Sequence, residues 1–159
     1  DAISKGYIAF VIGGRHVTKM LPIEKIVAII NKLKKPVILI GGPADFEKGE
    51  HIVEQSLETI NACGKFTINQ SAYLIKHAEY VITHDTGMMH IAAALKKKIY
   101  SVWGSTVPEF GMTPYKTGEI SRIIEIKNLA CRPCSKIGYN KCPEGHFQCM
   151  KEINEDSFL

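Results

Sequence analysis

The chain has 159 residues, of which 45% are hydrophobic and 23% charged, a composition typical of one folded domain and not of a disordered or fibrous protein. Its apolar runs, such as Tyr7–Ile12, fall far short of the roughly 20 residues that cross a membrane. Twenty basic against sixteen acidic residues leave a net charge of +4, too small for a nucleic-acid-binding surface and suited to an anionic small ligand or an anionic membrane.

Short apolar runs alternate with helical patterns along the chain. In order, the sequence predicts a strand over Tyr7–Ile12, a helix over Pro22–Leu33, a strand over Val37–Ile40, a helix over Phe46–Ile60, a short strand around Ala62–Gly64, a helix over Asn69–Ala78, a strand over Tyr80–Thr83, a helix over Gly87–Leu95, strands over Ile99–Trp103 and Ile120–Ile126, and a final helix over Met150–Leu159. Asp45 is a candidate cap for the second helix. This alternation predicts an α/β fold with about six parallel strands, doubly wound because the strands are apolar on both faces.

Glycines and polar side chains follow four of the predicted strands. They are Gly13, Gly14, Thr18 and Lys19 after the first, Gly41, Gly42, Asp45 and Glu47 after the second, His84, Asp85, Thr86, Gly87 and His90 after the fourth, and Gly104, Ser105 and Thr106 after the fifth. Ligands bind outside the carboxyl ends of the strands in open parallel sheets, so we expect a site at this edge. Glycines and polar residues also mark ordinary loops, which is the alternative for any single exit.

The segment after the fourth predicted strand carries the sharpest signal. A strand, then Asp85-Thr86-Gly87, then a helix leaves unpaired backbone N–H groups that bind phosphate with the help of the helix dipole. Gly87 has no side chain to obstruct close approach. A carboxylate facing a diphosphate is unfavourable, so we assign Asp85 to a cap or to sugar hydroxyls. His90, one turn into the helix, fits a packed side chain as well as a ligand contact.

Lys19 is expected to be an exposed lysine that supplies a counter-charge for phosphate beside this helix end. Two other phosphate motifs are absent from the sequence. It has no Gly-x-x-x-x-Gly-Lys-Ser/Thr loop and no Gly-x-Gly-x-x-Gly fingerprint. These absences argue against a nucleoside triphosphatase and an ordinary dehydrogenase.

Several blocks, taken in order, resemble glycosyltransferase family nine, the ADP-heptose:lipopolysaccharide heptosyltransferases. They are Val17-Thr18-Lys19, Val37–Pro43, Asp85–Ala94, Val102–Thr106 and Pro114-Tyr115, and the Asp-Thr-Gly-x-x-His-x-Ala-Ala block is the most specific. The resemblance runs from about Gly13 to Met150 and is to the C-terminal half only. It implies one Rossmann-like nucleotide-sugar-binding domain over 1–159, half of a two-domain GT-B fold, with a cysteine-rich segment over 128–150.

The resemblance also implies what the chain lacks. The sequence begins with Asp1 and not Met, and we expect a piece of a longer protein. The N-terminal acceptor domain, which carries the catalytic base of the family, is expected to be absent from this chain. The chain alone is therefore expected to bind the donor without catalysing transfer.

Individual roles follow from the same resemblance. Thr18 and Lys19 match a diphosphate-contacting Thr-Lys, Thr86 and Gly87 a phosphate-holding loop, Asp85 an essential carboxylate near the donor sugar, His90 a histidine at that site, and Glu47 or Asp45 an acid that contacts the ribose. Asp85 and Lys19 are the expected catalytic residues. No cofactor is required, because Lys19 and the helix end replace a divalent metal at the donor.

The expected function is to bind ADP-heptose for transfer of heptose to the lipopolysaccharide inner core. The alternatives are a non-catalytic nucleotide-binding module and a GT-B transferase that uses another nucleotide sugar. The resemblance implies a cytoplasmic protein at the inner face of the inner membrane of a Gram-negative bacterium. Its partners would be the ADP-sugar and the lipid-linked acceptor, with peripheral membrane association and no nucleic acid.

Four of the five cysteines, Cys131, Cys134, Cys142 and Cys149, lie within nineteen residues, with His146 among them. Their spacing permits a tetrahedral structural zinc site. Four reduced thiols or two disulfides are the alternatives, and the cytoplasmic location implied by the resemblance disfavours disulfides. Cys63 stands apart and is expected to be a small buried hydrophobic residue.

Overall fold

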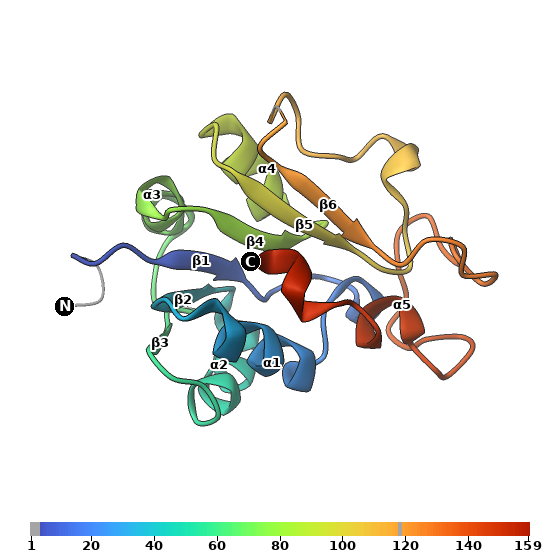
Figure 1. Ribbon diagram of the computed structural model, residues 1–159, viewed down its shortest axis with the longest axis horizontal. Coiled ribbons are helices and arrows are strands. Elements are labelled where there is room, and N and C mark those ends of the chain that lie inside the picture. Colours follow the sequence, from blue (N-terminus) through green and yellow to red (C-terminus); the bar gives the residue numbers. More distant parts are fainter. Residues whose placement is uncertain (1–3, 118) are drawn as a thin grey trace.

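The sheet of this protein is parallel throughout the part of the chain that can be described. The computed structural model describes residues 4–117 and 119–159, so the first three residues of the predicted domain and Gly118 lie outside the described residues. The strands are β1 (Ile8–Val11), β2 (Val37–Ile40), β3 (Thr59–Asn61), β4 (Val81–His84), β5 (Ile99–Trp103) and β6 (Arg122–Glu125). Their order is β3-β2-β1-β4-β5-β6, and each neighbouring pair is parallel (Figure 1). The predicted doubly wound α/β fold is confirmed.

Helices cover both faces of this sheet. They are α1 (Ile23–Leu33), α2 (Phe46–Val53), α3 (Ile68–His77), α4 (Gly87–Ala94) and the short α5 (Gln148–Lys151). Helices α1 and α2 lie on one face together with the C-terminal 3-10 turn Glu155–Phe158, and α3 and α4 lie on the other (Figure 1). A helix therefore joins each strand to the next from β1 to β5, as the crossover connections of parallel strands require.

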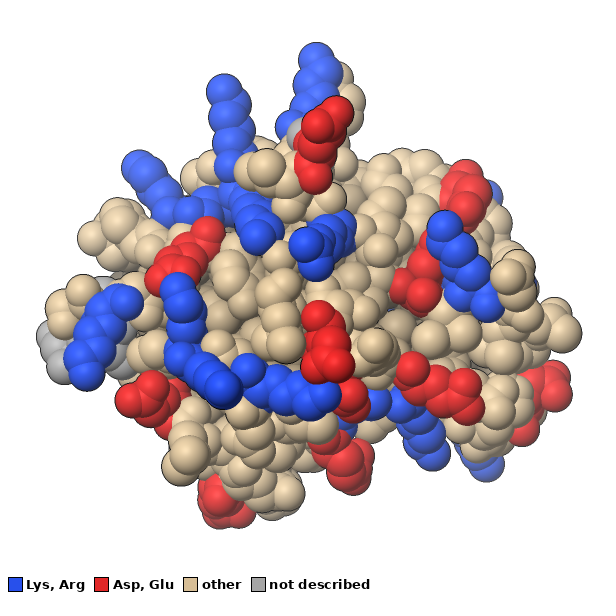
Figure 2. Space-filling model, viewed as in Figure 1, with Lys and Arg blue, Asp and Glu red and all other residues tan. Residues whose placement is uncertain are grey.

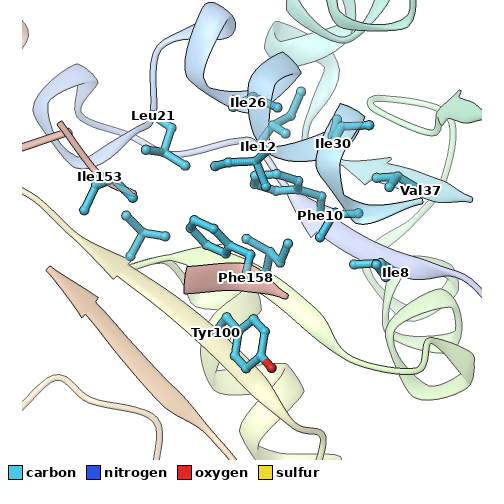
Figure 3. Close-up of a cluster of buried hydrophobic side chains, with 14 of the residues drawn as sticks. Ile8, Phe10, Ile12, Leu21, Ile26, Ile30, Val37, Tyr100, Ile153 and Phe158 are labelled. Carbon is cyan, nitrogen blue, oxygen red and sulfur yellow. The ribbon is translucent and has the colours of Figure 1, made fainter. Parts of the chain in front are cut away.

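Two hydrophobic cores result, one on each face of the sheet. Ile8 and Phe10 of β1 pack toward α1, in the cluster that contains Phe158 (Figure 3). Ala9 and Val11 point to the opposite face and pack toward α3 and α4. Because successive side chains of a strand point to opposite faces, a strand buried on both sides is apolar at every position. This explains the unbroken apolar runs in the sequence.

Two helix boundaries differ from the prediction. Helix α2 ends at Val53 and not at Ile60. Leu57, expected on the buried face of a longer helix, is 84% exposed, and Glu58 has a left-handed backbone conformation with φ of 49° that a helix cannot contain. The third strand consequently begins at Thr59, earlier than expected. The predicted final helix is divided into α5 and the 3-10 turn after it. In the first case the apolar spacing continues past the residue at which α2 ends.

The visible surface carries charges of both signs. Figure 2 shows Lys and Arg side chains interspersed with Asp and Glu over this face, with long basic side chains projecting from its upper part. Within residues 4–117 and 119–159, no helix has both the length and the hydropathy needed to cross a membrane.

Candidate functional site

A pocket of about 860 Å³ lies at the carboxyl edge of the sheet, the edge that the sequence predicted. It lies where the strand order reverses, between β1 and β4, which is the usual ligand position in open α/β sheets. Its volume is in the range of small-molecule sites. The lining includes Lys19, Asp45, Asp85, Thr86 and Gly87.

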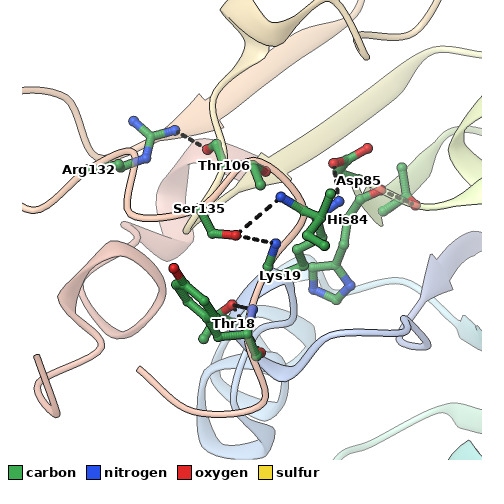
Figure 4. Close-up of polar contacts among 11 residues, drawn as sticks. Thr18, Lys19, His84, Asp85, Thr106, Arg132 and Ser135 are labelled. Atoms are coloured by element: carbon green, nitrogen blue, oxygen red, sulfur yellow. Dashed lines mark hydrogen bonds and ion pairs between the residues drawn. The ribbon is translucent and has the colours of Figure 1, made fainter. Parts of the chain in front are cut away.

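The two predicted catalytic residues form an ion pair in this pocket. Lys19 Nζ lies 2.7 Å from Asp85 Oδ2, and their side chains are only 17% and 8% exposed (Figure 4). The expectation of a freely exposed Lys19 was therefore wrong, because the fold places it beside a carboxylate. Asp85 does not cap α4 either, since the N-cap position belongs to Thr86. The carboxylate instead holds the lysine ammonium at the pocket.

The N-terminus of α4 borders the same pocket. Thr86, Gly87 and Met88 line it, and the side chain of the N-cap residue Thr86 makes no capping hydrogen bond to the first turn of the helix. A Cβ added at Gly87 would meet no atom within 4 Å, so the space in front of this turn is open. Unpaired amides, the helix dipole and the Lys19 ammonium together favour an anion at this point.

Asp45 lies on the other side of the pocket. Asp45 occupies the N-cap position of α2, as predicted, but its carboxylate makes no capping bond to that helix and instead accepts a hydrogen bond from Gly42 N at 2.9 Å. A Cβ on Gly13 would lie 2.5 Å from Asp45 Oδ2, which shows how closely the two strand exits approach. Glu47, the other candidate for ribose, is exposed and does not line the pocket.

Two further predicted contacts lie away from the pocket lining. Thr18 is 1% exposed, and its hydroxyl accepts a hydrogen bond from Tyr139 N at 2.7 Å. His90 is exposed on α4, outside the lining. The sequence placed Thr18 and His90 at the correct edge of the sheet, but it could not say where their side chains point.

His84, at the end of β4, is buried and serves the scaffold. Its Nε2 accepts a hydrogen bond from Leu21 N at 2.9 Å, which ties the chain after β1 to β4. Burial lowers the pKa of His84 to about 3, so the ring is neutral at physiological pH. A second base, the half-buried Lys48, donates to Ile12 O at 3.2 Å, and desolvation lowers its pKa. Both residues support the loop that follows β1.

Several residues of the pocket were not among the predicted site residues. They are Val11, Arg15, His16, Ile40, Ile68, Ser71, Met88, Ile91 and Ile137. The position of Arg15 and His16 directly after Gly13-Gly14 was a usable signal. Ile137 offered none, because its segment reaches the pocket only through the tertiary fold.

The cysteine-rich segment carries free thiols. All five cysteines are unpaired, and Cys63 is buried as predicted. Burial raises the pKa of Cys149 to about 11 and also raises the pKa of Cys134, with neighbouring cysteines adding to both effects. Cys131 Sγ lies 3.9 Å from His146 Nε2. Across the described residues, no three His, Cys, Asp or Glu side chains are grouped closely enough to hold a metal ion.

Comparison with known proteins finds one family. A family model described as glycosyltransferase family 9 (heptosyltransferase) matches residues 1–142. Lipopolysaccharide heptosyltransferase 2 of Escherichia coli K12 is 33% identical over 133 residues, which cover 77% of this chain and 35% of that protein. The chain thus spans about a third of the length of the curated relatives that it matches.

Solved structures share the fold. A family 9 glycosyl transferase from Veillonella parvula superposes with a TM-score of 0.75 at 24% identity, covering 98% of this chain and 44% of that one. TibC of enterotoxigenic E. coli, described as a dodecameric iron-containing heptosyltransferase in complex with ADP-D-β-D-heptose, gives 0.68 at 17% identity, covering 95% and 42%. At these identities the likeness shows the fold alone.

Proposed function

Because the chain belongs to glycosyltransferase family 9, the heptosyltransferases, we propose that it binds the ADP-heptose donor of an enzyme that adds heptose to the lipopolysaccharide inner core. The curated relative from E. coli is named a lipopolysaccharide heptosyltransferase, and a structural neighbour is described with ADP-heptose bound. The chain corresponds to part of such enzymes, so the full transfer reaction is assigned to the longer protein.

One observation carries this proposal: the pocket joins an ammonium group to an open helix N-terminus. Lys19 Nζ and the first turn of α4 border the same space, with room in front of Gly87. Phe66 and Ile68 also line the pocket, and their apolar side chains suit a flat base. This combination of an anion site and an apolar wall is what a nucleoside diphosphate requires.

The geometry suggests how these residues assist transfer. When the bond between sugar and diphosphate breaks, negative charge grows on the leaving diphosphate, and Lys19 with the α4 amides stabilises it. Asp85 holds the Lys19 ammonium in place and is near enough to the pocket for a donor hydroxyl. Of the two acids considered for the ribose, Asp45 is favoured because it lines the pocket.

Transfer also needs a base for the acceptor hydroxyl and a second wall for the cleft. We propose that both come from a domain that this chain does not include, with the lipid-linked acceptor bound there. The chain alone should then bind ADP but transfer no heptose. Steady transfer of heptose by the 159-residue chain alone would refute the proposal that another domain supplies the base and the acceptor site.

Titration calorimetry with ADP, UDP and GDP tests the donor assignment. ADP should bind most tightly, and ADP-heptose should compete with it. Equal affinity for the three nucleotides would favour a generic diphosphate site or another nucleotide sugar. An absence of binding to any of them would refute the nucleotide site itself.

A structural zinc at the four clustered cysteines stays a prediction. Four free thiols suit a tetrahedral thiophilic ion, and a structural neighbour is described as iron-containing. The described side chains, however, do not converge on a metal position. Elemental analysis of the purified protein, compared with a Cys131→Ser/Cys134→Ser variant, tests it: stoichiometric metal lost in the variant supports the site, and a metal-free wild type refutes it.

We also propose that the enzyme works at the cytoplasmic face of the inner membrane, as a peripheral protein. The proposal rests on the lipopolysaccharide named for the curated relative and on the surface lysines of this chain. Sedimentation of the longer protein with vesicles containing anionic lipid tests it. Binding that vanishes with neutral lipid supports electrostatic attachment, and no binding to either vesicle refutes it.

A further inference from the structure

The cysteine-rich segment lies against the loop that carries Lys19. Thr18 N donates to Tyr139 O at 3.0 Å, and Tyr139 N donates to Thr18 Oγ1 at 2.7 Å. Thr18 Oγ1 in turn donates a hydrogen bond to Tyr139 O at 3.1 Å. Since Thr18 is 1% exposed, water does not compete for these bonds. The residue next to Lys19 is thus fastened to a segment far away in the sequence.

Gly138 brings the same segment into van der Waals contact with the loop. A Cβ built on Gly138 would lie 2.7 Å from His16 Cβ and 3.3 Å from Lys19 Cγ. The backbone at Gly138 has φ of 104°, a conformation that residues with a side chain rarely adopt. Ser135 Oγ shapes this turn by accepting a hydrogen bond from Gly138 N at 2.8 Å. Only glycine permits so close an approach.

The other end of the segment is anchored to the sheet. Arg132 donates to the carbonyl oxygens of Gly104, at 2.6 Å, and Thr106, at 3.1 Å, and it pairs with Glu125 at 2.6 Å. The Arg132 and Glu125 side chains are 6% and 9% exposed. The segment is therefore fixed at the ends of β5 and β6 and can hold the Lys19 loop against them.

We propose that the cysteine-rich segment is a positioning element for the anion site. Through Gly138 and the Thr18–Tyr139 hydrogen bonds it holds the backbone of Lys19, so that the ammonium group reaches the pocket. Thr18 then acts on the ligand through the backbone, since its hydroxyl is engaged by Tyr139. The inference rests on the proposed nucleotide site, because Lys19 is the group that is positioned.

Two alanine variants of the segment separate positioning from general destabilisation. Gly138→Ala introduces a Cβ that must displace His16 and Lys19. Gly145→Ala imposes the same kind of backbone strain, with φ of 77°, but its Cβ would meet no atom within 4 Å. Each variant is measured for ADP affinity by calorimetry, for thermal stability, and for amide hydrogen exchange at Thr18 without ligand.

Gly138→Ala should weaken ADP binding roughly tenfold and speed exchange at Thr18, because a displaced ammonium loses much of a charge-assisted contact. Gly145→Ala should leave both unchanged even if it lowers the melting temperature as much. If wild type binds ADP and Gly138→Ala binds it equally well, the positioning role is refuted while the nucleotide site stands. If wild type does not bind ADP, the proposed function fails, and exchange at Thr18 alone decides whether the segment holds the loop.

Replacement of Thr18 is a second test that keeps the backbone unstrained. Thr18→Val removes the oxygen that accepts from Tyr139 N, whereas Thr18→Ser retains it. Valine should lower ADP affinity and speed exchange of the Tyr139 amide, and serine should restore both. The Thr18→Val/Gly138→Ala double variant should be no weaker than Gly138→Ala, because both changes break one link. Fully additive losses would instead show that the Thr18 hydroxyl contacts phosphate directly, and they would overturn the proposal.

Discussion

The two edges of the sheet use charged residues in opposite ways. At the amino edge, Lys34 and Lys96 follow α1 and α4 in left-handed conformations, where a positive charge complements the helix C-terminus. Lys35 pairs with Glu79 in contact with solvent. At the carboxyl edge, the ion pairs Lys19–Asp85 and Arg132–Glu125 are largely buried, although Arg15 and Glu47 at the same edge are exposed. Burial and pairing, and not the number of charges, distinguish a binding edge from a solvated one.

Replacement of Arg132 should show the largest effect, because Arg132 and Glu125 form the most buried ion pair at the carboxyl edge. Arg132→Met leaves Glu125 unpaired and removes the hydrogen bonds to several backbone carbonyl oxygens. The free energy of unfolding should therefore fall by about 3–5 kcal/mol. Urea denaturation measures the loss. Lys35→Met at the amino edge is the matched control and should cost far less. Equal losses would show that the two edges do not differ in the way described.

Lys19→Ala should weaken ADP binding by about ten- to a hundredfold, since it removes one charge-assisted contact to phosphate. It should also destabilise the fold, because Asp85 would be left buried without its partner. Lys19→Ala/Asp85→Asn should recover stability but not affinity. Lys76→Ala removes the same charge from the exposed end of α3 and should change neither.

Calorimetry at increasing salt sharpens this test. Salt should weaken binding by wild type more than by Lys19→Ala, because the variant lacks the charge that is screened. If Lys19→Ala binds ADP as tightly as wild type at low salt, the phosphate site lies elsewhere.

His84 should make stability depend on pH. Its pKa is about 3 in the folded protein against an ordinary value of 6.5 for histidine, so between these values the unfolded chain binds the additional proton. The contribution of neutral His84 to the free energy of unfolding is complete above about pH 6.5. It is lost as pH falls, at about 1.4 kcal/mol per pH unit. His84→Gln should flatten this part of the unfolding profile. An unchanged profile would show that another group controls acid stability.

Gly87→Val should weaken ADP binding by about tenfold, as the branched side chain would occupy the space in front of the α4 amides. Because that space is open, the melting temperature should change little. Gly87→Ala, which adds one carbon, should have a smaller effect on binding. A valine variant with wild-type affinity would place the phosphate away from this helix.

Glu79→Ala should have the smallest effect. The Lys35–Glu79 pair is exposed, and such pairs contribute less than about 1 kcal/mol. ADP affinity should be unaffected, as measured in the same calorimetric assay. A loss comparable with that of Arg132→Met would mean that solvent exposure does not govern the value of these ion pairs.

Much of the architecture was predictable from local patterns. Unbroken apolar runs such as Val37–Ile40 identified strands covered on both faces, and alternation with helices fixed parallel pairing. Errors arose where no local signal marks a turn, as at Glu58, where apolar spacing continues beyond the end of α2. Strand exits with glycine then placed Lys19 and Asp85 at one edge, because parallel strands share their direction.

The sequence by itself determined the fold class, the edge that carries the pocket and the family resemblance, since these depend on periodicity and on motif order. Only the tertiary structure decided that Lys19 pairs with Asp85, that Thr18 turns away from the pocket, and that residues near Gly138 reach the same loop. Side-chain direction and contacts between distant segments depend on how the whole chain packs. Neither is encoded in the spacing of neighbouring residues, so each had to be read from the folded protein.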